Sequence, residues 1–252
     1  MQHTADPTPV DCRFDAAATA QMERIVMDLR RMYHERNEAL REVTRAHHEA
    51  LLRLALAAEY RDDDTGVHMA RIGYLAEALA LALGQPAAFA AMLRRAAPMH
   101  DVGKIGIADA VLKKPGIYTP DERRQMNQHA QIGAEILGRS RVPLFQLAAE
   151  VAMTHHERWD GRGYPHGLAG EAIPASGRIV AVVDFFDALT MDRCYRDAFA
   201  DDVALAMLAD QRGAAFDPQV VDTFIANAAA LIELRDRINR QPPTFEELAA
   251  LE

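Results

Sequence analysis

The chain has 252 residues, of which 50% are hydrophobic and 26% are charged, so it can bury a sizeable core and is not a mainly disordered protein. Its 28 basic and 37 acidic residues give a formal net charge of −9, which argues against binding to duplex DNA, where clustered basic residues must neutralise phosphates. The two cysteines, Cys12 and Cys194, exclude a disulfide scaffold and a cysteine-rich zinc site.

The beginning of the chain predicts neither an export signal nor a membrane anchor. Residues 1–14 contain Pro7 and Pro9 without any periodicity, which predicts a flexible N-terminus, and they lack the basic and apolar regions of a signal peptide. The most apolar stretch, residues 74–83, is interrupted by Glu77 and is shorter than the roughly 20 residues of a transmembrane helix. We therefore expect a cytoplasmic protein without membrane contact.

Residues 15–60 predict one long, coiled-coil-like helix, because no glycine or proline interrupts them. Alternating steps of four and three residues define a seam with two polar interruptions. The seam residues are Met22, Val26, Leu29, Tyr33, Arg36, Leu40, Val43, His47, Ala50, Leu54 and Ala57. Two interpretations stay open: a parallel homodimer helix that passes a signal to the following domain, or a helix packed on its own domain. The length of the seam favours the homodimer, although it is poor in leucine and isoleucine.

Residues 61–252 predict an all-α domain, because nearly every periodic segment has helical spacing and short Gly/Pro breaks separate the segments. The expected helices are 66–83, 87–98, 119–138, 144–157, 175–191, 201–211 and 217–239. Residues 158–174 form the longest stretch without periodicity, rich in glycine. A loop of that length inside a compact domain is usually functional.

Histidines and aspartates gather at the edges of the apolar helices. They are Asp64, His68, His100, Asp101, His129, His155, His156 and Asp184. Asp64 and His68 are four residues apart and share a helix face, and an unpaired Asp184 would be costly to bury in its apolar run. Any one of these residues alone could be a hydrogen-bonded core residue. Together they predict two or more metal ions, of a kind that imidazole and carboxylate bind well, such as Fe, Mn, Zn or Ni.

Several motifs in this order resemble the HD-GYP domain, a subgroup of the HD metal-dependent phosphohydrolases. They are His68-Met-Ala-Arg71, His100-Asp101-Val-Gly-Lys104, His129, the run HHERWDGRGYP at 155–165, and Asp184-Phe-Phe-Asp187-Ala-Leu-Thr190. The resemblance extends over residues 61–227, and the HHERWDG-GYP string is highly specific. It implies an all-α, HD-type helical bundle with two or three Fe or Mn ions. It also implies hydrolysis of cyclic di-GMP to the linear dinucleotide pGpG or onward to GMP.

The resemblance also implies roles for individual residues. It assigns metal ligation to all eight histidines and aspartates, with Asp101 bridging two metals. It places Lys104 at the scissile phosphate, Arg193 and Arg196 at the other phosphate, and the loop of Gly163, Tyr164 and Pro165 beside the substrate. We expect a metal-bridging hydroxide to attack phosphorus in line with the ribose 3′-oxygen, while Lys104 stabilises the developing charge. The alternative for the two arginines is a solvated helix end.

Two departures from the family pattern and two alternative functions remain open. Asp64 stands where three-metal members usually have Glu, so the number of metals and the second hydrolytic step are undecided. Cys194 replaces a usual Pro and is either inert packing or a redox-sensitive thiol. The alternative functions are an HD phosphohydrolase for another cyclic dinucleotide and a weakly catalytic signalling scaffold that binds diguanylate cyclases. The intact ligand set argues against the scaffold.

Overall fold

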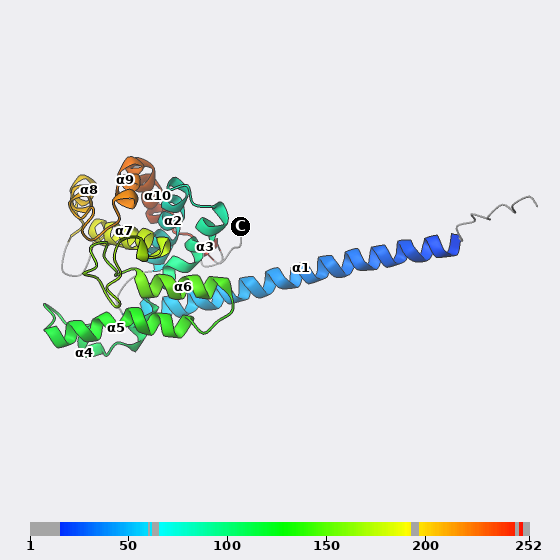
Figure 1. Cartoon of the computed structure of the whole chain (residues 1–252), viewed down its shortest axis with the longest axis horizontal. Helices are drawn as coiled ribbons and strands as arrows, with labels where there is room; N and C mark the ends of the chain where they lie inside the picture. The colour runs from blue at the N-terminus through cyan, green and yellow to red at the C-terminus, as the bar shows by residue number, and fades with distance from the viewer. Residues whose placement is uncertain (1–15, 60, 62–65, 193–196, 245–246, 249–252) are drawn as a thin grey trace, which may run out of the picture. The chain divides into compact units, whose positions relative to one another are not determined.

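The computed structural model describes residues 16–59, 61, 66–192, 197–244 and 247–248. Within these residues the regular elements are all helices, apart from two isolated bridges, so the predicted all-α class is confirmed (Figure 1). The helices are α1 Ala16–Glu59, α2 Gly66–Ala82, α3 Ala87–Ala96, α4 Asp109–Leu112, α5 Pro120–Leu137, α6 Pro143–Thr154, α7 Ala175–Thr190, α8 Asp201–Asp210, α9 Pro218–Ala226 and α10 Ala228–Arg240, with short 3₁₀ helices η1 Ala97–Met99, η2 Val102–Gly106 and η3 Gly170–Ala172. The predicted flexible segment 1–14 lies outside the described residues. No helix in the described ranges is both long and apolar enough to span a membrane.

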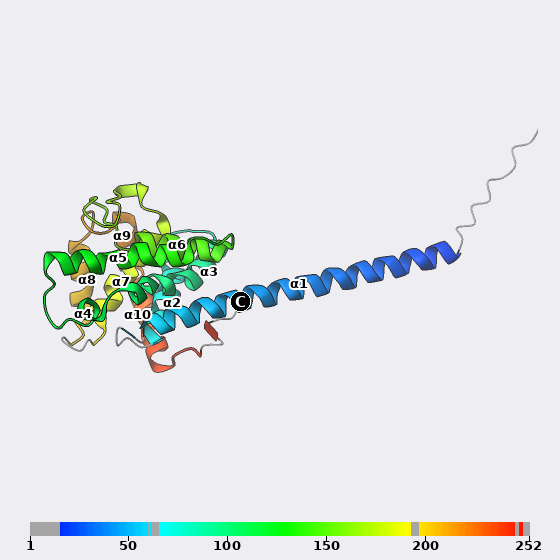
Figure 2. The same cartoon turned by 90° about the horizontal axis from the view of Figure 1, so that it is seen from below.

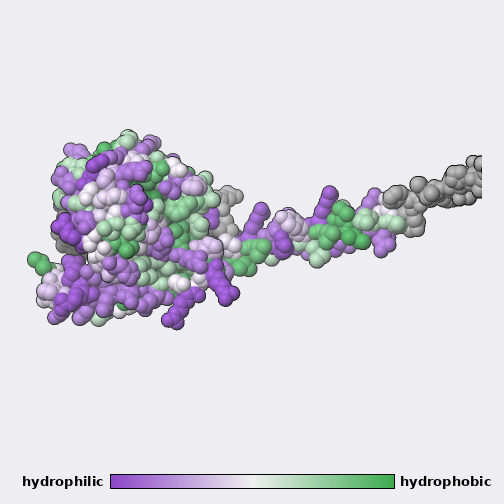
Figure 3. All heavy atoms as spheres, in the orientation of Figure 1, coloured by the Kyte–Doolittle hydropathy of each residue, from purple (hydrophilic) through white to green (hydrophobic). Residues whose placement is uncertain are grey.

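The chain divides into two units, residues 1–46 and residues 47–252. In the first unit, the described part is the beginning of the predicted long helix, α1, whose side chains are almost all exposed. The apolar seam residues are among them, with Met22 62% exposed and Leu29 59% exposed. Figure 3 shows these hydrophobic side chains between hydrophilic ones along the helix. Within the described residues of the first unit, nothing covers the apolar side chains of α1.

The last turns of α1 belong to the second unit and use a different face. Their buried side chains are His48, Leu51, Leu52, Ala55, Ala58 and Glu59. Of the seam positions in these turns, Ala50, Leu54 and Ala57 are exposed, while His47 is half-buried with its ring 6.1 Å from that of Phe145. The helix therefore packs on its domain with one face while the apolar seam positions stay open to solvent.

In the second unit, two large hydrophobic clusters of side chains hold the helices together. Figures 1 and 2 show how these helices are arranged. The larger cluster forms where α2 packs against α3, α7 and α10, and at its centre the rings of Phe186 and Phe224 are 4.9 Å apart. The other cluster joins the end of α1 to η1, α5 and α6, around Leu52 and Met99. Helices α5 and α6 lie side by side, so residues at their ends are brought next to each other.

Local sequence explains where several helices begin. Thr119 and Glu122 form a capping box at the start of α5, with Pro120 at the first helical position, where its missing N–H costs nothing.

Helix α7 contains the run Ile179–Val183, which is rich in β-branched residues and has a weak helix propensity. Ile179 and Val183 are fully buried, so packing stabilises the helix against that preference.

One predicted helix is wrong. The expected single helix 217–239 is two helices, α9 and α10, separated at Asn227, whose backbone has φ −109° and ψ 12°. The Asn227 side chain donates from Nδ2 to the Thr223 carbonyl oxygen at 2.8 Å. Short amide side chains compete with the helical backbone in this way, so a helix can end without the glycine or proline that marks the other breaks.

Gly103 allows η2 to lie directly against α5. A Cβ atom at this position would overlap the backbone carbonyl oxygen of His129 and the backbone nitrogen of Gly133. Backbone atoms of a packed helix cannot move aside cheaply, so this contact requires glycine. At Gly106, in the same 3₁₀ helix, an added Cβ would meet only the side chain of Ile132, at 3.0 Å.

We expect Gly103→Ala to lower the free energy of unfolding by about 3 kcal/mol, because the added methyl group separates η2 from α5. The matched control, Gly106→Ala, should cost about 1 kcal/mol, since a flexible side chain can yield. Urea unfolding followed by circular dichroism measures both. Equal costs for the two variants would contradict the close packing at Gly103.

Candidate metal centre

Five histidines that are far apart in the sequence converge in the second unit. His68 comes from α2, His100 from the turn between η1 and η2, and His129 from α5, while His155 and His156 follow the last residue of α6. The ring centroids form a continuous series, with separations of 5.5, 5.2, 5.5 and 4.0 Å between neighbouring rings. All except His156 are buried. Helix packing, and not proximity in sequence, therefore builds this cluster.

The predicted ligands form two groups, whose nitrogen and oxygen atoms lie within 4.8 Å of one another inside each group. The first ligand group is Asp101, His129, His155 and His156; the second ligand group is His68, His100 and Asp184. In the second group, Asp184 Oδ1 is 3.7 Å from His100 Nε2 and 4.0 Å from His68 Nε2. Two separate groups match the expectation of more than one ion.

Asp101, a member of the first ligand group, also faces the second ligand group. Its Oδ1 atom is 3.2 Å from His129 Nε2 and 3.6 Å from His155 Nε2, both in the first ligand group. Its Oδ2 atom is 3.3 Å from His100 Nε2, in the second ligand group, and 2.8 Å from Lys104 Nζ. This is the placement that the predicted bridging role requires.

The backbone determines which nitrogen of each ring faces the centre. His100 Nδ1 donates to the Ala97 carbonyl oxygen at 3.0 Å, and His129 Nδ1 donates to the Met126 carbonyl oxygen at 2.8 Å. His155 Nδ1 likewise donates to backbone carbonyls of α6. A carbonyl oxygen can only accept a hydrogen bond, so these Nδ1 atoms carry a proton, and Nε2 is the atom of each ring whose lone pair can bind a metal.

These lone pairs make the residues suitable for divalent cations. The Nε2 atoms of His129 and His155 are 3.4 Å apart, and both point at the Asp101 carboxylate, so three acceptors face one another. His100 Nε2 and Asp101 Oδ1 are also buried without a hydrogen-bond partner. Such orphaned acceptors are costly in a protein interior unless a cation lies among them. The donor set of imidazole and carboxylate suits a transition metal.

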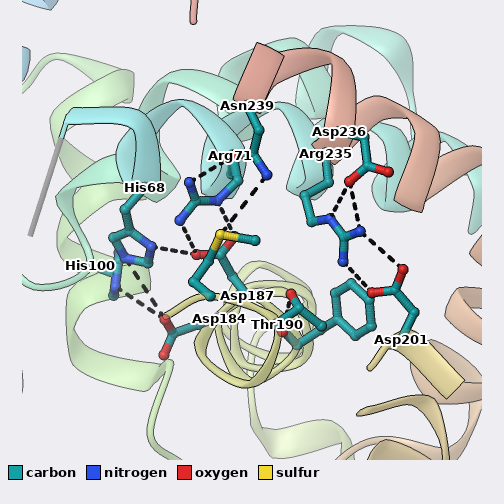
Figure 4. A network of polar contacts seen from close by, with 12 residues as sticks. His68, Arg71, His100, Asp184, Asp187, Thr190, Asp201, Arg235, Asp236 and Asn239 are labelled. Carbon is teal, nitrogen blue, oxygen red and sulfur yellow. Dashed lines mark hydrogen bonds and ion pairs between the residues drawn. The ribbon is translucent and has the colours of Figure 1, made fainter. Parts of the chain in front are cut away.

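Asp187 and Arg71 orient His68 from behind (Figure 4). His68 Nδ1 donates to Asp187 Oδ2 at 2.8 Å, and Arg71 donates to the same carboxylate from Nε at 2.5 Å and from Nη2 at 2.9 Å. Burial alone would raise the pKa of Asp187, but His68 and Arg71 lower it to about 2. The sequence analysis gave neither residue a role, although both stand in its motifs and Asp187 is one helical turn from Asp184.

In the absence of a metal, His100 carries a positive charge at neutral pH. Burial alone would lower the pKa of His100, but the carboxylates of Asp101 and Asp184 raise it to about 10. A metal ion that binds His100 Nε2 must therefore displace a proton. Burial alone would raise the pKa of Asp101, but Lys104 and His100 hold it well below its usual range. Asp101 is therefore ionised at neutral pH, as a metal ligand must be.

His155 and His156, which follow α6, are uncharged. Burial lowers the pKa of His155, and burial together with the neighbouring rings of His155 and His129 lowers the pKa of His156 well below its usual value. Neutral imidazole is the form that binds metals, so both side chains are ready to act as ligands at neutral pH.

The predicted substrate loop of Gly163, Tyr164 and Pro165 lies against His156. The Tyr164 ring is 4.8 Å from the His156 ring, and Pro165 follows it in a cis peptide bond. A Cβ atom on Gly163 would overlap the backbone of residues 156–158, so only glycine permits this close approach. Burial raises the pKa of Tyr164, which keeps its phenol protonated and able to donate a hydrogen bond.

The remaining predicted site residues have no structural account. Asp64, Arg193 and Arg196 lie outside the described residues, as does Cys194. Buried Glu157 was missed by the sequence analysis: it accepts from the backbone nitrogens of His166, at 2.7 Å, and Leu168, at 2.9 Å, and so holds the loop after Tyr164.

Comparisons with known proteins agree with this geometry. A family model described as an HD domain matches residues 27–220. The cyclic di-GMP phosphodiesterase response regulator RpfG of Xanthomonas campestris pv. campestris is 46% identical over 196 residues, which cover 78% of this chain and 52% of that protein. A cyclic di-GMP phosphodiesterase of Thermotoga maritima is 46% identical over 177 residues, 70% of this chain and 48% of that protein. The 3′3′-cGAMP-specific phosphodiesterase 2 of Vibrio cholerae is 42% identical over 187 residues, 74% of this chain and 36% of that protein.

The chain spans about half the length of the first two relatives and about a third of the other. A crystal structure of a cyclic GMP-AMP-specific phosphodiesterase of V. cholerae aligns with a TM-score of 0.59 and 18% identity, covering 78% of this chain and 54% of that chain. At this level of identity the comparison shows the shared fold alone, and it confirms the HD-type helical bundle.

We expect Asp187→Asn to weaken Mn(II) binding 10–100-fold, because the amide no longer accepts two charged hydrogen bonds and His68 loses its fixed orientation. Calorimetric titration of metal-free protein with Mn(II) measures the change. The matched control is Asp222→Asn, which removes a bidentate pair with Arg212 on the exposed surface and should leave Mn(II) affinity unaltered. Equal effects of the two substitutions would contradict the orienting role.

Proposed function

Because this chain belongs to the HD domain family, in the group that carries the HD-GYP motifs, we propose that it is a metal-dependent phosphodiesterase that hydrolyses cyclic di-GMP. The observation that carries the proposal is the placement of Asp101 between two groups of metal-ligating side chains. Centres with two neighbouring divalent ions are typical of enzymes that cleave phosphate esters.

We infer that the first ligand group holds one ion, that the second ligand group holds another, and that Asp101 serves both. Asp64 is proposed as a further ligand, so the total is two or three ions, with Fe or Mn favoured. Divalent ions bound here would polarise a phosphate and supply a nucleophile from water at neutral pH. The chain's part is to hold imidazole rings and carboxylates at fixed positions, which the backbone hydrogen bonds made by the Nδ1 atoms support.

The substrate would be held by residues that are not metal ligands. Lys104, next to Asp101, is proposed to stabilise the charge that develops on the scissile phosphate. The protonated phenol of Tyr164 can donate to a phosphate oxygen from the adjacent loop, formed with Gly163 and Pro165. Arg193 and Arg196 are proposed for the second phosphate. This local positive charge explains how a chain with a net charge of −9 binds a dianion.

The main alternative substrate is 3′3′-cGAMP. It has the same two phosphates, so the metal ligands and basic residues would serve both dinucleotides. The V. cholerae relative named for 3′3′-cGAMP favours it, whereas the two relatives with 46% identity are named for cyclic di-GMP. We therefore propose cyclic di-GMP as the substrate. A cytoplasmic location and binding to diguanylate cyclases stay predictions from the sequence.

We expect purified protein loaded with Mn(II) or Fe(II) under anaerobic conditions to convert cyclic di-GMP to pGpG or GMP faster than it converts 3′3′-cGAMP. Replacing His100 and Asp101 by Ala should reduce the rate at least about 1,000-fold and release metal, because both ligand groups lose a member. Anion-exchange chromatography of the products and metal analysis of the protein give the two readouts.

The control for this experiment is His34→Ala, an exposed histidine on α1 that should change neither rate nor metal content. Metal-filled protein that turns over only 3′3′-cGAMP would establish the alternative substrate. Absence of turnover of either dinucleotide would reject the proposed activity.

We further propose that residues 15–60 form a homodimerisation and signalling helix attached to a phosphohydrolase domain of residues 61–252. Two observations support a second copy of this chain as the occupant of the seam. The apolar seam residues are exposed on α1, and the face that packs on the domain is a separate one. A long amphipathic helix in water is marginally stable without a partner along its apolar stripe.

We expect Leu29→Glu to weaken the homodimer at least about 100-fold, because each of the two copies loses about 1.5–3 kcal/mol of apolar burial at the seam. Met27→Glu is the matched control, since Met27 is equally exposed but outside the seam. Sedimentation equilibrium of both variants and the parent protein measures the dissociation constants. A parent protein that is monomeric at micromolar concentration would reject the dimer.

A further inference from the structure

Arg61 joins the end of α1 to the 3₁₀ helix η2. It closely follows α1, and its backbone nitrogen donates to the carbonyl oxygen of Ala58, in the last turn of that helix, at 3.1 Å. Ala58 is buried in the same hydrophobic cluster as Leu51 and Leu52, which packs this part of α1 on the domain. The packed end of α1 therefore determines where Arg61 lies.

The guanidinium group of Arg61 spans the C-terminal end of η2. Its Nη1 atom donates to the carbonyl oxygen of Lys104, at 3.3 Å, and to that of Ile105. Its Nη2 atom donates to the carbonyl oxygen of Ile107, at 3.0 Å, and to Asp109 Oδ1, at 2.6 Å. The last carbonyl groups of a helix have no partner within it, so a basic side chain that binds them fixes the helix end. Arg61 thus caps η2 from outside.

The contacts with the carbonyl groups explain why an arginine stands at this position. Arginine carries several donors in fixed directions on one planar group, so it can bind several acceptors at once. The ion pair with Asp109 is a weaker reason, because the Asp109 side chain is 66% exposed and exposed ion pairs contribute little to stability. The structure therefore assigns the Arg61 side chain mainly to the backbone of η2.

The helix η2 carries Lys104, and its two ends have different anchors. Lys104 Nζ is 2.8 Å from Asp101 Oδ2, and the Lys104 side chain is 21% exposed. At the start of η2, next to Asp101, Gly103 lies directly against the backbone of α5. Near the other end, the backbone of Lys104 itself accepts a hydrogen bond from Arg61. Packing thus holds the beginning of η2, and Arg61 holds its end.

We propose that Arg61 is a positioning residue for Lys104: by capping η2 it keeps the ammonium group of Lys104 beside Asp101. The inference rests on the role in catalysis that is proposed above for Lys104. It also connects the end of α1 to the candidate metal centre through a residue that is not a metal ligand. Because Gly103 holds the start of η2 independently, loss of Arg61 should displace Lys104 and leave Asp101 in place.

The test is acetylation of the lysines in the metal-free full chain, with the rate at each site measured by mass spectrometry. The chain has three lysines, which are Lys104, Lys113 and Lys114. Arg61→Ala should increase the acetylation rate of Lys104, relative to that of exposed Lys113, about 10-fold. The reason is that the ammonium group would lose its contact with Asp101 and become accessible to the reagent.

Lys114 provides the reference for a general loosening of the domain. Its Nζ atom is 2.5 Å from Glu122 Oε2, at the start of α5, and Arg61 makes no contact with either residue. The acetylation rate of Lys114 relative to Lys113 should therefore be the same in Arg61→Ala and in the parent protein.

Two further variants complete the labelling experiment. Arg212→Ala is the matched control, because it removes an exposed arginine that binds the carboxylate of Asp222, and it should leave the Lys104 rate unaltered. Arg61→Lys keeps the charge but has a single donor group, so it should increase the Lys104 rate less than Arg61→Ala does. It also carries the test if Arg61→Ala does not fold.

Turnover gives a second readout, which a general loss of structure would not reproduce. In metal-loaded protein, Arg61→Ala should lower kcat for cyclic di-GMP about 10–100-fold. In a Lys104→Ala background the same substitution should change kcat less than about 2-fold, because the residue that it positions is absent. The affinity for Mn(II), measured by calorimetric titration, should stay at the parent value, since Gly103 still holds the turn that carries Asp101.

Unchanged acetylation of Lys104 in both Arg61 variants would overturn the proposal. An equal loss of kcat in the two backgrounds would also overturn it, and so would weakened Mn(II) binding, because either result gives Arg61 a general structural role. The labelling and the Mn(II) titration contain no nucleotide. A parent protein that turns over neither dinucleotide would therefore reject the proposed activity, while the labelling still decides whether Arg61 holds Lys104.

Discussion

The candidate site depends on one half-buried carboxylate, Asp101, that faces several imidazole rings. Asp101 is surrounded by the Nε2 atoms of His129 and His155, while backbone carbonyls hold the opposite nitrogen of each ring. The rings cannot turn away, because that would break the hydrogen bonds made by their Nδ1 atoms. The centre thus presents imidazole nitrogens and carboxylate oxygens suited to a divalent cation, and the packed helices hold them in place.

The packing of the helices explains how these side chains are held. Ligands come from α2, α5, α7 and the segments that follow η1 and α6, and two hydrophobic clusters fix these elements relative to one another. Gly103 brings the turn that carries Asp101 against α5, and Gly163 brings the substrate loop against His156. Close backbone contact at both places makes the geometry of the centre a property of the packed core.

Helix α1 has two faces with different roles in the molecule. Its last turns bury Leu51, Leu52 and Ala55 against the domain. The apolar positions of its seam stay exposed, even in the turns that pack on the domain, whereas the seam residue His47 is half-buried. The proposed homodimer would use these exposed apolar positions.

Periodicity, capping and motif spacing are local properties, so the amino-acid sequence was enough to predict the all-α class, most helix limits and the histidines and aspartates of the candidate site. It did not predict the break at Asn227, where a side-chain hydrogen bond ends the helix. The fold was needed to show that Asp101 lies between two ligand groups and that Asp187 holds His68, since such roles depend on which distant helices pack together.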